Sequence, residues 1–173
     1  DQIANYIKSQ GLNVEFNQNK LDTIHIISHG NSGELSLGNA TLNIESMRSQ
    51  YSDELAVINK SLKSDADLFI YGCNFGEGLL GEQAVSLLAN KTGADVAASN
   101  DNTGAGSLGG DWDLEVELGT FESSAITATD WHGILGPGGP EVKISGTSDG
   151  VENSADGTFT IELLNTNGID GLT

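Results

Sequence analysis

Two segments of the chain consist almost entirely of apolar and β-branched residues, and each is followed by a glycine-containing turn. They are residues 23–28 and residues 67–71. Such near-continuous apolar runs are typical of strands buried on both faces. A third strand is expected at residues 94–98, after a helix at residues 80–91 that stops at Gly93. This order of strand, helix and strand predicts an α/β fold with a mostly parallel sheet flanked by helices.

Shorter elements are expected around these strands. The apolar spacing predicts a short helix at residues 3–11 and a helical region at residues 44–62. Short strands are expected at residues 34–37 and 40–42. Residues 111–118 alternate strictly between apolar and mainly acidic side chains, which predicts a half-exposed strand, antiparallel or at a sheet edge.

A change of composition divides the chain near its end. Residues 134–140 contain both prolines of the sequence and several glycines, which predicts a linker. Residues 1–133 are therefore expected to form the main domain. Residues 141–173 contain two further alternating stretches and are expected to begin a separate all-β domain.

The charge of the chain restricts its partners and its location. The 25 acidic residues outnumber the 7 basic ones, for a formal net charge of -18. Such a surface repels phosphate backbones and anionic lipids, so we expect no nucleic-acid partner. No apolar stretch approaches the roughly 20 residues of a membrane helix, so we expect no insertion into a membrane. Acidic, lysine-poor composition is typical of extracellular bacterial modules, in which calcium can offset the charge. We therefore expect an extracellular or cell-surface location, with calcium as a candidate ion.

The sequence pattern identifies no metal ligands. The acidic side chains of residues 111–117 could bind calcium, but a solvated strand face accounts for them better. Cys73 is the only cysteine, which excludes an internal disulfide and a structural zinc site built from several thiolates. It is either a reactive thiol or a small buried apolar residue, and unpaired cysteines are more often the latter.

The residues after the two apolar strands form a candidate catalytic pair. His29 and Gly30 follow the first strand, and Gly72 and Cys73 follow the second. Catalytic groups gather at the carboxyl ends of parallel strands, and neighbouring strands lie about 4.8 Å apart. An imidazole beside a thiol suits nucleophilic catalysis, because the histidine can accept the thiol proton and later protonate a leaving amine. The backbone N–H groups of Gly30 and Cys73 could form an oxyanion hole.

Two motifs carry a resemblance to a known superfamily. Residues 26–30 read Ile-Ile-Ser-His-Gly and residues 69–76 read Phe-Ile-Tyr-Gly-Cys-Asn-Phe-Gly. Together they resemble the paired motifs of the clan CD cysteine peptidases, which include caspases, gingipains, separases and metacaspases. Residues 81–99 are similar to the caspase-like CHAT branch. Residues 109–115 resemble an uncharacterised domain family of very large bacterial surface and repeat-rich proteins.

The resemblance implies a caspase-like cysteine endopeptidase domain in residues 1–133, lacking its first strand, with His29 and Cys73 as the catalytic dyad. It implies a polypeptide substrate, which could be the parent chain itself, and no cofactor for the chemistry. Metacaspases have an acidic residue two positions before the cysteine, where this sequence has Tyr71. Their specificity for basic residues therefore does not carry over, and Tyr71 and Asp101 are candidates for substrate contacts.

Residues 141–173 resemble the start of a Calx-β or cadherin-like repeat, on Val151, Glu152, Asn153 and the stretch 157–161. The alternative to a peptidase is a structural or adhesive module that keeps the fold without catalysis. A calcium- or carbohydrate-binding spacer would also suit the acidity, but it leaves His29 and Cys73 unexplained.

Overall fold

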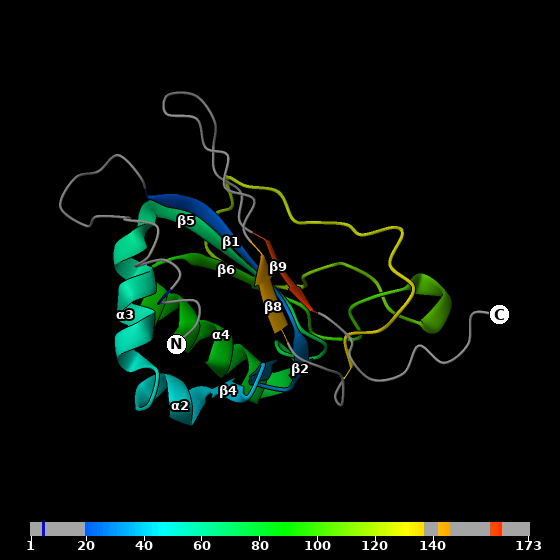
Figure 1. Ribbon diagram of the computed structural model, residues 1–173, viewed down its shortest axis with the longest axis horizontal. Coiled ribbons are helices and arrows are strands. Elements are labelled where there is room, and N and C mark those ends of the chain that lie inside the picture. Colours follow the sequence, from blue (N-terminus) through cyan, green and yellow to red (C-terminus); the bar gives the residue numbers. More distant parts are fainter. Residues whose placement is uncertain (1–4, 6–19, 137–141, 146–159, 164–173) are drawn as a thin grey trace.

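The computed structural model describes residue 5 and residues 20–136, 142–145 and 160–163 (Figure 1). The helix expected at residues 3–11 lies outside the described residues except for Asn5, which is helical. The described elements, in chain order, are β1 (Leu21–Ile27), β2 (His29–Asn31), β3 (Glu34–Leu37), β4 (Ala40–Asn43), α2 (Ile44–Arg48), α3 (Ser52–Ser61), β5 (Leu62–Tyr71), α4 (Gly78–Thr92), β6 (Asp95–Ala98), the 3-10 helix η1 (Gly106–Leu108), β7 (Val116–Leu118), β8 (Val142–Ser145) and β9 (Thr160–Leu163).

The main sheet of the described residues has six strands in the order β7-β6-β5-β1-β9-β8. The four inner strands β9, β1, β5 and β6 run parallel to one another. The outer strands β7 and β8 are antiparallel to β6 and β9, respectively. The expected α/β fold with a mostly parallel sheet is therefore confirmed. A small antiparallel sheet, β2-β3-β4, follows directly after β1.

The two faces of the main sheet are covered in different ways. The even-numbered residues of the central strands, such as Ile26 and Ile70, join the larger apolar core. Helices α2, α3 and α4 lie together on that side of the sheet (Figure 1). The odd-numbered Phe69 and Tyr71 face the other way and belong to a second core with Trp112. In the described part of the chain, residues 99–115 and 119–136, on either side of β7, cover this second face, and we call them the cover segment.

The helical region expected at residues 44–62 consists of two helices. Asn43 caps α2, with reciprocal hydrogen bonds between Asn43 and Ser46 that form a capping box. The helix stops early: the hydroxyl of Ser49 donates a hydrogen bond to the carbonyl of Glu45 (2.7 Å). Serine side chains of this kind compete with the helical backbone and favour helix ends. The predicted stop of α4 is confirmed, because Gly93 has a left-handed φ of 70°.

The alternating stretch at residues 111–118 forms a strand only in its last part. Strand β7 lies at the sheet edge, antiparallel to β6, as expected. The expectation of a strand from residue 111 is wrong for residues 111–115, which are not part of a named strand. Trp112 and Leu114 are nevertheless buried while Asp113 between them is exposed. In residues 111–115 the alternation therefore reflects alternate burial of side chains against the sheet, and not pairing with a neighbouring strand.

The end of the main domain differs from the expected boundary. Residues 134 and 135 were expected in the linker, but Leu135 is only 1% exposed and packs in the second core. Its N–H also donates to the carbonyl of Thr103 (2.9 Å). The domain thus includes at least Leu135, and residues 137–141 of the expected linker lie outside the described residues.

Strands β8 and β9 confirm the two strands expected after the linker. They pair with each other, and β9 pairs with β1 through His25 opposite Thr160 and Ile26 opposite Ile161. Among the described residues they extend the main sheet instead of starting a second one.

Candidate functional site

Cys73 lies in a tight turn at the carboxyl end of β5. The N–H of Phe75 donates to the carbonyl of Gly72 (3.0 Å), which closes the turn around Cys73 and Asn74. Asn74 has a φ of 60°, the left-handed conformation that asparagine tolerates better than most residues. The N–H of Asn74 donates to the carbonyl of Asp101 (2.7 Å). The cysteine is therefore held in a defined backbone conformation.

His29 follows β1, in a segment that lies beside the turn of Cys73. The last paired residues of β1 and β5 are Ile27 and Tyr71, and the N–H of Ser28 still donates to the carbonyl of Tyr71 (3.2 Å). Beyond these residues the two segments stay close, because Gly30, the residue after His29, lies against the backbone of Gly72 and Cys73. The expectation that the two strands are neighbours is thus confirmed.

Gly30 allows the two chain segments to touch at this point. A Cβ atom added to Gly30 would lie 2.7 Å from the carbonyl carbon of Gly72 and 2.8 Å from the carbonyl oxygen of Cys73. Both distances are below van der Waals contact, so a side chain at residue 30 would push the two turns apart. The backbone N–H of Cys73 has no carbonyl partner among the described residues. These features are compatible with the expected oxyanion hole at Gly30 and Cys73.

The side chains of His29 and Cys73 are both buried, but they are not hydrogen-bonded to each other. His29 is 8% exposed, and its Nδ1 atom is buried without a hydrogen-bond partner. Cys73 is 0% exposed, and its sulfur accepts a hydrogen bond from the N–H of Thr103 (3.3 Å). The thiol also lies 3.6 Å from the carbonyl oxygen of Thr103. Within the part of the chain that the structure describes, no hydrogen bond links the imidazole to the thiol.

The environment of Cys73 keeps its thiol protonated. Burial raises the pKa of the Cys73 thiol, and the N–H groups of Thr103 and of Cys73 itself oppose this rise only in part. The carboxylate of Asp101 raises the same pKa further by repulsion. Since the thiolate is the attacking species, the thiol is not activated in this arrangement.

Aromatic and aliphatic residues of the cover segment close the space over Cys73. The ring of Trp112 lies 5.7 Å from that of Tyr71 and meets the ring of Trp131 edge-on at 6.3 Å. Leu135 completes the same core beside Cys73. A substrate could reach the sulfur only if part of the cover segment moved.

Tyr71 is buried in the second core. It is 0% exposed, and its hydroxyl accepts a hydrogen bond from the N–H of Ile126 (2.6 Å). Burial raises the pKa of Tyr71 to about 12. The ring points into the second core because Tyr71 lies on the face of β5 that carries Phe69, and contact of Tyr71 with substrate stays a prediction.

Asp101 lies at the surface beside the cysteine turn. Its carboxylate forms an exposed cluster with Asp111 and Glu115, in which the ligand atoms lie within 4.8 Å of one another. Desolvation and the neighbouring carboxylates of Asp111, Glu115 and Asp113 raise the pKa of Asp101. Asp101 thus remains available for contact with a polypeptide near Cys73.

His25 provides a pH-dependent contribution to stability. It is 3% exposed and stacks on Phe69 with a centroid separation of 4.9 Å. Burial lowers the pKa of His25, although the Asp67 carboxylate raises it in part. The neutral ring therefore stabilises the fold above the ordinary histidine pKa of 6.5, and this contribution is lost as the pH falls through the lowered folded-state value.

We expect the free energy of unfolding to fall between pH 7.5 and pH 5.5 by more in the wild type than in His25→Phe, which keeps a stacked ring without a titrating group. Urea unfolding at the two pH values measures the difference. Equal losses in both proteins would show that His25 does not cause the effect.

Sequence reasoning identified His29, Gly30, Cys73 and Asp101 but missed the residues that cover the thiol. Thr103 is a loop threonine whose backbone alone contacts the sulfur, so no sequence signal marks it. Trp112 was recognisable as the apolar side of an alternating stretch.

Among the described residues, none of the helices has the length and apolar character needed to cross a membrane.

Comparisons with other proteins give one match. Neither curated proteins nor solved structures match the chain. One family model, described as a domain of unknown function (DUF4347), matches residues 3–135. The matched region ends at Leu135, which packs in the second core. The chain therefore belongs to the DUF4347 family.

Proposed function

We propose that this domain is a caspase-like cysteine endopeptidase, with Cys73 as nucleophile and His29 as general base and acid, in a latent state with the thiol covered. One observation carries the proposal: β1 and β5 are neighbouring parallel strands, and the segments that follow their carboxyl ends, with His29 and Cys73, lie against each other at Gly30 and Gly72. The buried and unpartnered Nδ1 of His29 adds support, because a buried polar atom without a partner is costly unless it serves another role.

The reaction needs only these residues and water. The imidazole of His29 takes the proton of the Cys73 thiol, and the sulfur attacks the peptide carbonyl carbon. The N–H groups of Cys73 and Gly30 stabilise the oxyanion of the tetrahedral intermediate. Protonated His29 then gives its proton to the leaving amine, which leaves a thioester on Cys73. Water, deprotonated by His29, hydrolyses the thioester and releases the carboxylic acid and the free thiol.

The surface charges beside Cys73 would favour one class of substrate. The exposed carboxylates of Asp101, Asp111 and Glu115 beside the cysteine turn would attract a basic side chain near the scissile bond. The parent polypeptide is a natural substrate, since a site embedded in it meets its own flanks at high effective concentration. The acidic composition fits action outside the cell or on its surface.

The Calx-β or cadherin-like character of residues 141–173 belongs to the same proposal. It would make the peptidase domain part of a longer extracellular repeat protein. The pairing of β9 with β1 supports close association of this segment with the peptidase domain.

The alternative, a structural or adhesive module without catalysis, also has an observation in its favour. Cys73 packs in an apolar core and hydrogen-bonds with the Thr103 backbone instead of His29. If the module is structural, Cys73 serves only as a small buried residue, and His29 has no influence on it.

A peptidyl electrophile distinguishes the two functions. We use Leu135→Ala, which removes an apolar contact over the thiol, to loosen the cover segment. In this background the probe should label Cys73, and adding His29→Ala should slow labelling about 100-fold or more, within the usual effect of general-base catalysis. Mass spectrometry of the labelled peptide measures the rates. Equal rates with and without His29 would favour the structural module.

A further inference from the structure

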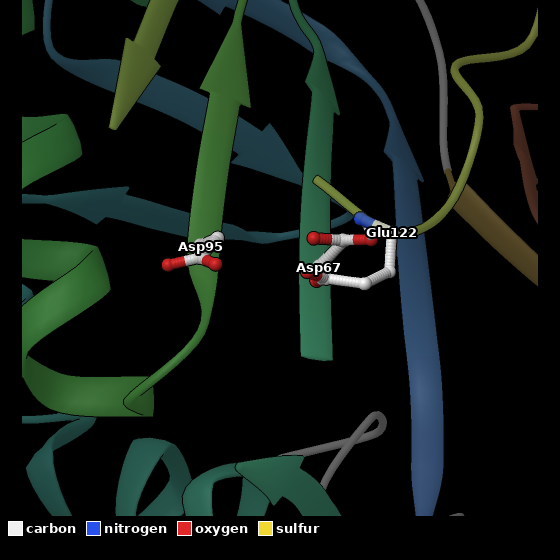
Figure 2. A group of neighbouring side chains, drawn as sticks. All are labelled: Asp67, Asp95 and Glu122. Atoms are coloured by element: carbon white, nitrogen blue, oxygen red, sulfur yellow. Dashed lines mark hydrogen bonds between the residues drawn. The ribbon is translucent and has the colours of Figure 1, made fainter. Parts of the chain in front are cut away.

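Three carboxylates lie together on the same sheet face as Cys73, but near the other end of the strands. Asp67 comes from β5, Asp95 begins β6, and Glu122 belongs to the cover segment. Figure 2 shows the carboxyl groups of Asp67 and Glu122 next to each other, with Asp95 on the neighbouring strand. Four residues of extended strand separate Asp67 from Tyr71, about 13 Å at ~3.3 Å per residue, and Cys73 lies beyond Tyr71 in the turn that follows β5. The cluster is therefore separate from the candidate peptidase site.

The arrangement is unfavourable for carboxylates alone. Asp67 is directly opposite Asp95 in the parallel register, and like charges at opposed positions destabilise a sheet. Asp67 is also 0% exposed, and its Oδ1 atom has no hydrogen-bond partner. On its other side, Asp67 is opposite Thr23, whose buried hydroxyl is likewise without a partner. Buried polar atoms without partners are rare in proteins, and a bound ion or water molecule is a common partner of such atoms.

Backbone hydrogen bonds explain only part of the cluster. The Oδ2 atom of Asp67 accepts from the N–H groups of Glu122 (3.2 Å) and Ser123 (2.6 Å). The Oδ2 atom of Asp95 accepts from the N–H of Thr120 (3.1 Å). These bonds attach residues 120–123 to the sheet. They account neither for the free Oδ1 of Asp67 nor for the carboxylate of Glu122 beside it.

The spacing of the three side chains fits a bound cation. One carboxylate oxygen from each residue lies within 4.8 Å of the other two. Oxygens that share a calcium ion at about 2.4 Å are at most about twice that distance apart. The backbone also approaches closely here, because a Cβ atom at Gly119 would collide with the Asp95 carboxylate.

We propose that Asp67, Asp95 and Glu122 bind a calcium ion that fastens residues 119–123 of the cover segment to strands β5 and β6. The ion neutralises the opposed charges of Asp67 and Asp95 and supplies the partner that Asp67 Oδ1 lacks. Water molecules complete the six to eight oxygen ligands that calcium takes. Calcium fits better than magnesium, because ligands from two strands and a loop need not form a regular octahedron. The site is independent of whether Cys73 is catalytic.

Calcium titration of the whole chain after treatment with EDTA tests the site. We compare the wild type with Glu122→Gln by calorimetry and by terbium luminescence. Glu122 is exposed, and its carboxylate makes no hydrogen bond in the described residues, so this change should leave the fold intact. Loss of one charged ligand should weaken the calcium site at least tenfold. Glu115→Gln, in the exposed cluster of Asp101, Asp111 and Glu115, is the matched control and should leave this site unchanged.

Hydrogen exchange gives a second readout that reports the place of binding. Calcium should slow exchange of the amides of Thr120, Glu122 and Ser123 in the wild type and in Glu115→Gln, but not in Glu122→Gln. Asp67→Asn should also lose the effect, and if it fails to fold, Glu122→Gln still decides. Absence of calcium binding at millimolar concentration would overturn the proposal. So would binding that Glu115→Gln weakens and Glu122→Gln leaves unchanged.

Discussion

Iodoacetamide is expected to alkylate Cys73 in the native protein at least about 100-fold more slowly than in the urea-unfolded chain at the same pH. The sulfur is fully buried under the cover segment and its thiol pKa is raised, so reaction requires local opening. An opening that costs about 3 kcal/mol slows the reaction roughly 100-fold. Leu135→Ala should remove much of this protection, because truncating a buried leucine costs about 2–5 kcal/mol. Mass spectrometry of quenched samples measures the rates.

The control for this prediction is Leu88→Ala. Leu88 is as buried as Leu135, but it lies on helix α4 in the core on the opposite face of the sheet. The truncation is the same, yet it should not open the cover segment locally. Equal acceleration by both variants would indicate global unfolding instead. Rapid alkylation of the native wild type would show that the cover segment is open in solution.

Gly30→Ala is expected to destabilise the domain by roughly 3 kcal/mol or more. The new methyl group would meet backbone atoms of Gly72 and Cys73 at 2.7 and 2.8 Å, and backbone cannot rotate away as a flexible side chain can. Overpacking in well-packed regions costs about 1–3 kcal/mol, and a clash with backbone lies at the upper end. Urea unfolding followed by tryptophan fluorescence measures the loss.

The matched control is Gly106→Ala in η1. A Cβ atom there would meet nothing within 4 Å, so the substitution should be close to neutral. A similar stability for Gly30→Ala and Gly106→Ala would contradict the close contact between the turns that hold His29 and Cys73.

The sequence predicted the parts of the fold that depend on local pattern. The apolar runs of β1 and β5, the helix α4 with its stop at Gly93, and the short strands β3 and β4 all appear where expected. Each combines a clear periodicity with a glycine or polar turn at its end, so local and tertiary preferences agree.

The long cover segment was outside the reach of such reasoning. It contributes Trp112 and Leu135 to a core without forming an α-helix, and no periodicity indicates which irregular residues pack against which strand. The same limit applies to the cluster of Asp67, Asp95 and Glu122. Asp67 and Asp95 face each other only through the strand register, and Glu122 joins them from a loop. Contacts of this kind depend on tertiary structure.

Cleavage of the parent chain is the most direct test of the central claim. The domain is expressed with both natural flanks, as wild type, as Leu135→Ala, and as Leu135→Ala combined with Cys73→Ala or with His29→Ala. Intact-mass spectrometry then follows fragments over time. We expect fragments to form fastest in Leu135→Ala and to be absent when either Cys73 or His29 is replaced. Identical fragment patterns with and without Cys73, or no cleavage in Leu135→Ala, would contradict self-cleavage by the His29 and Cys73 pair.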